Sequence, residues 1–154
     1  MGLTLILIII FYPNGDKPNL DGSWNIKYIL LGNEEVINDK ISNDSSDVMF
    51  APFRTMTVQR NSFLLNIEKH KPINGLFKLI HKDTVILFSD FYRRYNSKYY
   101  IQIDTLKSTS NELEVNVTLL SPDKIILLYK SVDLAARRRW LREMNKLPKP
   151  RGTP

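Results

Sequence analysis

At 154 residues the chain has the length of one domain, and 43% apolar with 25% charged residues is ordinary for a globular protein. It contains no cysteine, which excludes disulfides, zinc fingers, iron–sulfur ligation and thiol catalysis. The net charge of +6 is concentrated in residues 134–154, which contain seven basic residues and one acidic residue. The rest of the chain has 15 basic and 15 acidic residues. Because the rest of the chain is neutral overall, the sequence does not indicate a nucleic-acid-binding domain.

The chain opens with a hydrophobic segment, since Leu3–Tyr12 reads LTLILIIIFY without a charge. It is shorter than the ~20 apolar residues that cross a bilayer. It has the length of a signal-peptide core, but no basic residue precedes it and no small-residue cleavage site follows it. Its β-branched residues would also suit a buried strand. We expect residues 1–13 to be a membrane-seeking or truncated transmembrane segment and residues 14–19 a linker, which predicts a membrane-associated protein with its sidedness open.

From residue 20 to residue 131 apolar and polar side chains alternate repeatedly, which is typical of strands. The eight expected strands centre on residues 24–30, 56–58, 63–67, 77–79, 85–87, 99–103, 113–119 and 125–129. Their loops are too short for the crossover connections of parallel strands, so the sheet must be antiparallel. The pattern predicts an all-β fold, an eight-stranded up-and-down barrel over residues 20–131, with a two-sheet β-sandwich as the alternative.

One connection is long and polar. Residues 32–53 show little periodicity, and loops of this length inside a small domain are usually lids, binding loops or disordered. We expect a lid, a binding loop or a disordered segment there.

Three features together resemble the lipocalin (calycin) superfamily over Leu20–Leu147. Gly22-Ser23-Trp24 matches the G-x-W that opens the first lipocalin strand, a long loop follows that strand, and a helix follows the eighth. The resemblance implies a barrel that Trp24 closes at one end. In that family an arginine near the end of the last strand covers the tryptophan; here Lys130 ends that strand, the nearest arginines belong to the expected helix, and the late T-D-Y motif is absent. The resemblance implies no particular ligand.

A set of mostly bulky apolar side chains is expected to face the barrel interior and to form a tentative ligand site. The set consists of Trp24, Tyr28, Met56, Phe63, Phe77, Tyr99, Val115 and Leu127. These side chains are apolar enough to line a pocket for an apolar small molecule. They are also bulky enough to fill a small barrel completely. Both alternatives remain open at this stage.

No group of residues forms a recognisable catalytic or metal-binding motif. His70 and His81 have no acidic cluster beside them, and the aspartates of the long loop lack the spacing of a calcium site. There is no G-x-S-x-G motif and no glycine-rich phosphate loop. We therefore expect no metal, no cofactor and no enzymatic activity.

Residues 132–147 are expected to form a basic amphipathic helix, with Asp133 as N-cap and Pro148 ending it. Its apolar stripe is Leu134, Ala136, Trp140, Leu141, Met144 and Leu147. We expect this stripe to pack on apolar residues of the outer barrel wall, which are Ile29, Leu31, Ile80, Ile126 and Leu128. The alternative is attraction to anionic lipid headgroups through Arg138, Arg142 and Lys146, with Trp140 at the interface. Residues 148–154 are expected to be a disordered tail.

Two hypotheses for function follow. The first is a lipocalin-like binding module near a membrane, which residues 3–12 contact, with an apolar small molecule as ligand. The second is a non-catalytic soluble terminal domain of a longer integral membrane protein. Nucleic acid is not an expected partner, and the sequence does not set the oligomeric state.

Overall fold

The computed structural model describes residues 18–38, 54–67 and 71–146. Several expected features lie outside the described residues. They are the membrane-seeking segment, most of the linker, the part of the long loop from residue 39 to residue 53, His70 and the C-terminal tail. The described elements are β1 (Gly22–Leu31), β2 (Glu34–Asn38), β3 (Thr55–Gln59), β4 (Ser62–Asn66), β5 (Ile73–His81), β6 (Thr84–Phe88), η2 (Arg93–Tyr95), β7 (Ser97–Ser108), β8 (Glu112–Leu120), β9 (Lys124–Asp133) and α3 (Leu134–Lys146).

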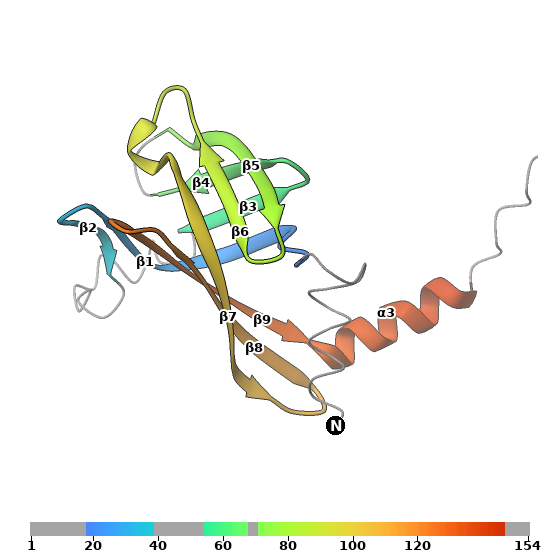
Figure 1. The fold of residues 1–154 in the computed structure, drawn as a ribbon. Helices are drawn as coiled ribbons and strands as arrows, with labels where there is room; N and C mark the ends of the chain where they lie inside the picture. The colour runs from blue at the N-terminus through green and yellow to red at the C-terminus, as the bar shows by residue number, and fades with distance from the viewer. Residues whose placement is uncertain (1–17, 39–53, 68–70, 147–154) are drawn as a thin grey trace, which may run out of the picture.

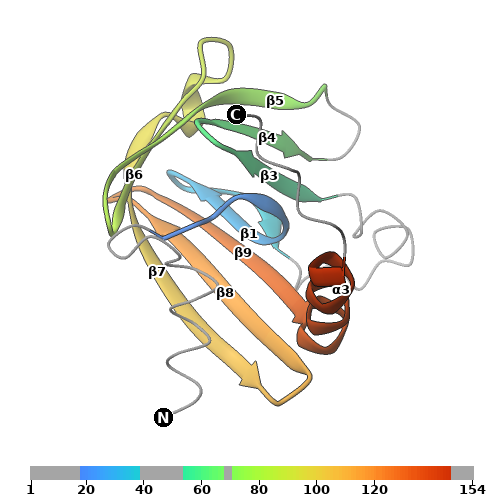
Figure 2. The ribbon, with the colours of Figure 1, turned by 90° about the vertical axis from the view of Figure 1, so that its right-hand side faces the viewer.

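The strands form a closed antiparallel barrel. The hydrogen-bonded order runs β1-β3-β4-β5-β6-β7-β8-β9, and β9 returns to β1. Figures 1 and 2 show β3–β6 and β7–β9 on opposite sides of the enclosed interior, with β1 joining the two groups. The eight-stranded barrel predicted from the alternating pattern is therefore confirmed, and the sandwich alternative is wrong.

A further strand, β2, lies outside the barrel circuit. Gly32 and Asn33 turn the chain after β1, and Gly32 has a positive φ of 64°. β2 then pairs with the second half of β1, Tyr28–Leu31. The first half of β1, Gly22–Asn25, pairs with β3 instead. The long loop expected from residue 32 to residue 53 is thus wrong in its first part, since Glu34–Asn38 is a strand.

A bulge in β1 changes which residues face the interior. The register against β9 shifts between Ile26 and Tyr28. Before the shift Trp24 and Ile26 are buried, and after it Ile29 and Leu31 are buried. A bulge adds one residue to a strand and so reverses the alternation beyond it. The expectation that Tyr28 faces inward is therefore wrong.

β9 has the opposite alternation to the expected one. Ile126 and Leu128 are buried at 0% and 2% exposure, while Leu127 is half-buried on the outer side. The expectation that Leu127 faces inward is therefore wrong. Because Ile29, Leu31, Ile126 and Leu128 belong to the core, the outer wall lacks most of the apolar surface that the helix was expected to cover.

Large side chains fill the barrel interior. The bulkiest fully buried ones are Trp24, Tyr99, Phe63, Ile29, Met56, Leu65, Leu87, Leu113, Leu119, Ile126, Val85 and Val115. The two ends of the barrel differ. We call the end where β1 begins and β9 finishes the Trp24 end, and the opposite end, where β1 turns into β2, the mouth.

α3 continues directly from β9. The backbone N–H of Ala136 donates to Oδ1 of Asp133 at 2.8 Å, so Asp133 is the N-cap as predicted, and the helix begins at Leu134 rather than at residue 132. Leu134 is buried, but Trp140 is 59% and Leu141 45% exposed. Figure 1 shows the helix extending away from the barrel. The expectation that its apolar stripe packs along the wall is wrong for Trp140 and Leu141, while the side chain of Met144 and all of Leu147 lie outside the described residues.

Candidate binding sites

Trp24 closes its end of the barrel. Its indole N–H donates to the carbonyl oxygen of Leu20 at 2.8 Å, and the side chain is 1% exposed. Leu20 is itself buried, so the segment before β1 folds across this end. The closing role that the sequence resemblance implied for Trp24 agrees with this geometry.

A lysine covers the ring of Trp24. The ammonium nitrogen of Lys130 lies 5.1 Å from the ring centroid, within the range of a cation–π interaction. Desolvation by burial, followed by the nearby positive charge of Arg137, lowers the pKa of Lys130. Gly22 has a φ of +113°, and a Cβ there would lie 2.9 Å from the same ammonium nitrogen. Gly22, Trp24 and Lys130 thus form one closing cluster.

The mouth holds a cavity of about 470 Å³. Its lining residues are Glu34, Glu35, Val36, Ile67, Ile73, Tyr92, Arg94 and Tyr95, from β2, the residue after β4, β5 and the region of η2. At its rim a guanidinium nitrogen of Arg94 lies 2.8 Å from a carboxylate oxygen of Glu34 and joins η2 to β2. The lining therefore combines aliphatic and aromatic side chains with three charged residues: Arg94 and Glu34 form the pair, and Glu35 adds a second negative charge.

Two tyrosines connect the mouth cavity to the core. The hydroxyl of Tyr99 donates to the carbonyl oxygen of Tyr95 at 2.8 Å. Burial raises the pKa of both hydroxyls above the ordinary tyrosine value. A general acid or base works best with a pKa near the working pH, and these two groups are shifted away from it. They are therefore neutral polar groups, and of the two Tyr95 lines the mouth cavity while Tyr99 supports it from the core.

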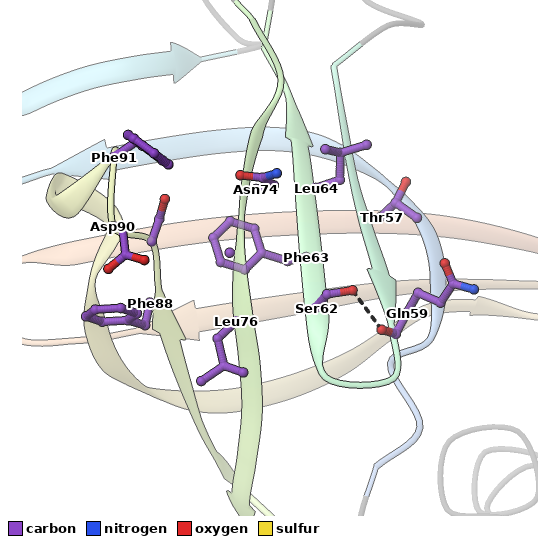
Figure 3. A pocket seen from close by; sticks show the side chains of 12 residues that line it. Thr57, Gln59, Ser62, Phe63, Leu64, Asn74, Leu76, Phe88, Asp90 and Phe91 are labelled. Carbon is purple, nitrogen blue, oxygen red and sulfur yellow. Dashed lines mark hydrogen bonds between the residues drawn. The ribbon is translucent and has the colours of Figure 1, made fainter.

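The outer wall carries a second hollow of about 530 Å³ over β3–β6, which we call the outer groove (Figure 3). Four exposed apolar residues lie around it, Leu64, Leu76, Phe88 and Phe91. Phe91 is 88% exposed. The segment that carries it is held at its base, because the side chain of Asn96 bonds both backbone groups of Ser89. Among the described residues that line the groove, Asp90 is the one with a charge.

Gly75 shapes the centre of the outer groove. A Cβ at this position would lie 2.3 Å from the carbonyl oxygen of Phe88 and 2.7 Å from the ring of Phe63, which is the cross-strand partner of Gly75. Because the first of these neighbours is backbone, only glycine fits here without moving β6. The ring of Phe63 can therefore line the groove although it is buried (Figure 3).

A third hollow, of about 670 Å³, lies on the outer face of β1, β7, β8 and β9. Tyr28 and Leu127 line it, together with Leu106 and Tyr129. The hydroxyl of Tyr28 lies 3.1 Å from a carboxylate oxygen of Glu35 and donates to it. Two residues expected inside the barrel thus meet on its outside.

The other residues of the tentative ligand site occupy the interior. Trp24, Met56, Phe77, Tyr99 and Val115 are buried and line none of the three hollows, and Phe63 lines only the outer groove. The structure does not bring the eight together around one space. The residues of the mouth cavity were missed, although the pairing of aromatic and basic residues in Tyr92-Arg93-Arg94-Tyr95 between two strands was a usable signal.

The four residues expected at a membrane surface all lie on α3 and are exposed. Arg138 is engaged by the barrel, since its guanidinium donates to the carbonyl oxygen of Ser110 and, at 3.2 Å, to Oδ1 of Asn111. Lys146 pairs with Glu143 at 2.7 Å. Arg142 and Trp140 project from the distal part of the helix.

Within the described residues, no group of three histidine or acidic side chains is placed to hold a metal ion. In the same part of the chain no helix has the length and hydrophobicity to cross a bilayer. Comparison with protein-family models, with curated proteins and with solved structures gives no match for this chain. The fold and its hollows thus define the class, a small closed antiparallel barrel with a packed interior.

Proposed function

We propose that the chain is a lipocalin-like binding module, held near a membrane through residues 3–12, that takes an apolar small molecule at the mouth of the barrel. The observation that carries the proposal is the mouth cavity of about 470 Å³. It lies at the end opposite Trp24, and its volume is within the range of small-molecule sites. The packed interior argues against the deeper site expected from the sequence.

The lining suggests the class of ligand. Val36, Ile67 and Ile73 offer aliphatic contact, and Tyr92 and Tyr95 offer rings with polar tips. The pair of Arg94 and Glu34 at the rim can accept a polar end group. A ligand with an apolar body and one polar, uncharged end matches this arrangement, because the lining carries two glutamates against one arginine.

Fluorescence titration with Nile red, an uncharged apolar dye that carries polar carbonyl and amine groups, tests the proposal. We expect Val36→Lys to weaken binding about tenfold, because it places a charge in the wall of the cavity. Leu76→Lys is the matched control: it makes the same kind of change on a strand, but in the outer groove, and should leave the affinity unchanged.

The exposed apolar rim of the outer groove favours a second candidate function, a non-catalytic domain that a larger membrane protein uses for contact. The same titration separates the two. If Leu76→Lys weakens the probe and Val36→Lys does not, the mouth is not the binding site and the outer groove is the functional surface. If both variants bind the dye with the same affinity as the unmodified chain, the dye binds in neither hollow. That result would contradict the ligand proposal.

A further inference from the structure

Helix α3 has an apolar side that the barrel does not cover. Leu134 is buried against the end of the barrel, whereas Trp140 and Leu141, both about two turns further on, are largely exposed. A helix of 13 residues is marginal in water when nothing packs against its apolar side. The distal part of α3 therefore needs a surface that the described residues do not supply.

The direction of α3 is fixed at its first turn. Asp133 caps it, and the backbone N–H of Leu134 donates to the carbonyl oxygen of Asn111 at 2.8 Å. The guanidinium of Arg138 holds the turn between β7 and β8 through Ser110 and Asn111. These contacts clamp the base of the helix while its distal turns extend outward.

The charge on α3 selects the kind of surface. Arg139, Arg142 and Lys146 are exposed and follow one another at spacings of three and four residues, so they share one side of the helix. Glu143 is the acidic residue of α3, and it is paired with Lys146. At the base, Arg137 adds to the positive charge of Lys130. An anionic surface complements this arrangement.

We infer that α3 is an interfacial helix that binds an anionic lipid surface, with Trp140 and Leu141 toward the acyl chains and Arg139 and Arg142 attracting the headgroups. Helices with a basic side and a side carrying tryptophan and leucine bind membranes in this way. The N-terminal side of the described chain begins at the same end as α3, since β1 starts where β9 finishes. The mouth then faces away from the membrane. This inference concerns a different surface from the ligand site and does not depend on it.

Flotation of the full chain with phosphatidylcholine vesicles, with and without phosphatidylserine, tests the inference. Residues 3–12 act equally on both vesicle types, so the difference between them reports the cationic helix. We expect tighter binding to the vesicles that contain phosphatidylserine, and we expect this preference to decrease as salt is added. In Arg139→Gln/Arg142→Gln the affinity for these vesicles should fall about fivefold for each cation removed. The control is Lys71→Gln/Arg93→Gln, which removes the same charge from exposed residues at the mouth end and should change nothing.

Quenching by brominated lipids adds a positional readout. The chain has two tryptophans, and Trp140→Phe should remove most of the quenching because Trp24 is buried. The inference is overturned if phosphatidylserine brings no preference, if both charge pairs reduce binding equally, or if Trp140 is not quenched. A vesicle-free dimer that Trp140→Ala dissociates would assign the apolar side to a second copy and also overturn it.

Discussion

The two tryptophans of this chain have opposite environments, and that contrast gives a direct test of the closing cluster. Trp24 is 1% exposed and bonded to Leu20, while Trp140 is 59% exposed. Trp24→Ala should lower the free energy of unfolding by about 3–5 kcal/mol, because it removes a large buried side chain and leaves a cavity. Trp140→Ala should stay within ~0.5 kcal/mol in the absence of membranes. Urea unfolding of both variants measures this, and similar losses in the two would contradict the assigned roles.

Lys130 gives the closing cluster a pH dependence. Its pKa is lower in the folded state than the ordinary value of 10.5, chiefly through desolvation. Between the two pKa values the unfolded state binds more protons, so this group makes the folded state more stable as pH rises. Below the folded-state pKa the cost of burying the charge is fully present.

Lys130→Met should remove this dependence while retaining most of the side-chain volume. We expect the free energy of unfolding of the unmodified chain to increase relative to that of the variant as pH rises from neutral toward 10.5. Tyr95 and Tyr99 titrate in both proteins and cancel in the comparison. A stability difference that stays constant across this pH range would show that Lys130 is not desolvated over Trp24.

At the level of elements, Asp133 decides where strand gives way to helix. Asp133→Ala removes the acceptor of the Ala136 N–H and should cost about 1 kcal/mol of helix stability. Because α3 has few contacts beyond its first turn, the loss should appear as reduced helical circular dichroism with the melting of the barrel nearly unchanged. Asp133→Asn keeps a capping oxygen and should retain the signal. A lowered barrel melt in Asp133→Ala alone would mean that α3 supports the barrel.

The strands could be predicted where side chains alternate and not where they do not. β8 reads ELEVNVTLL, and its buried residues are the expected ones. β2 was missed because Val36 and Ile37 are adjacent and show no period of two. In β9 the four consecutive residues 125–128 are all apolar, so the sequence does not show which of them face the interior. In β1 a bulge reverses the phase, and bulges depend on the pairing with a distant strand.

The sites were harder to predict than the strands. The closing role of Trp24 was expected through the family resemblance alone. The lysine over its ring was not predicted, because β9 brings Lys130 there from about 100 residues away. The mouth cavity instead assembles single residues from β2, β5 and the region of η2, which only the closed barrel brings together. The amphipathic pattern of α3 correctly predicted a helix, but the pattern alone does not say which surface covers its apolar side.

For the molecule as a whole, the barrel circuit closes within Gly22–Asp133. We therefore expect deletion of residues 1–13 to leave a cooperative thermal transition with a β-type circular dichroism spectrum. The full chain in the same detergent is the control. Loss of the transition would show that the hydrophobic segment belongs to the core, and it would remove the membrane contact assigned to residues 3–12.

The pairing of β1 with β9 also has a kinetic consequence. Asn25 meets Tyr129 across this seam, a separation of about 100 residues, and contacts this distant in sequence slow folding because the intervening chain must first be brought together. During synthesis one edge of β1 pairs early with β2 and β3, but the other stays unpaired until β9 has emerged, and an unpaired edge invites association with other chains. Because α3 follows β9 without a linker, the pairing of β9 with β1 closes the barrel and fixes the direction of the helix in the same late folding step.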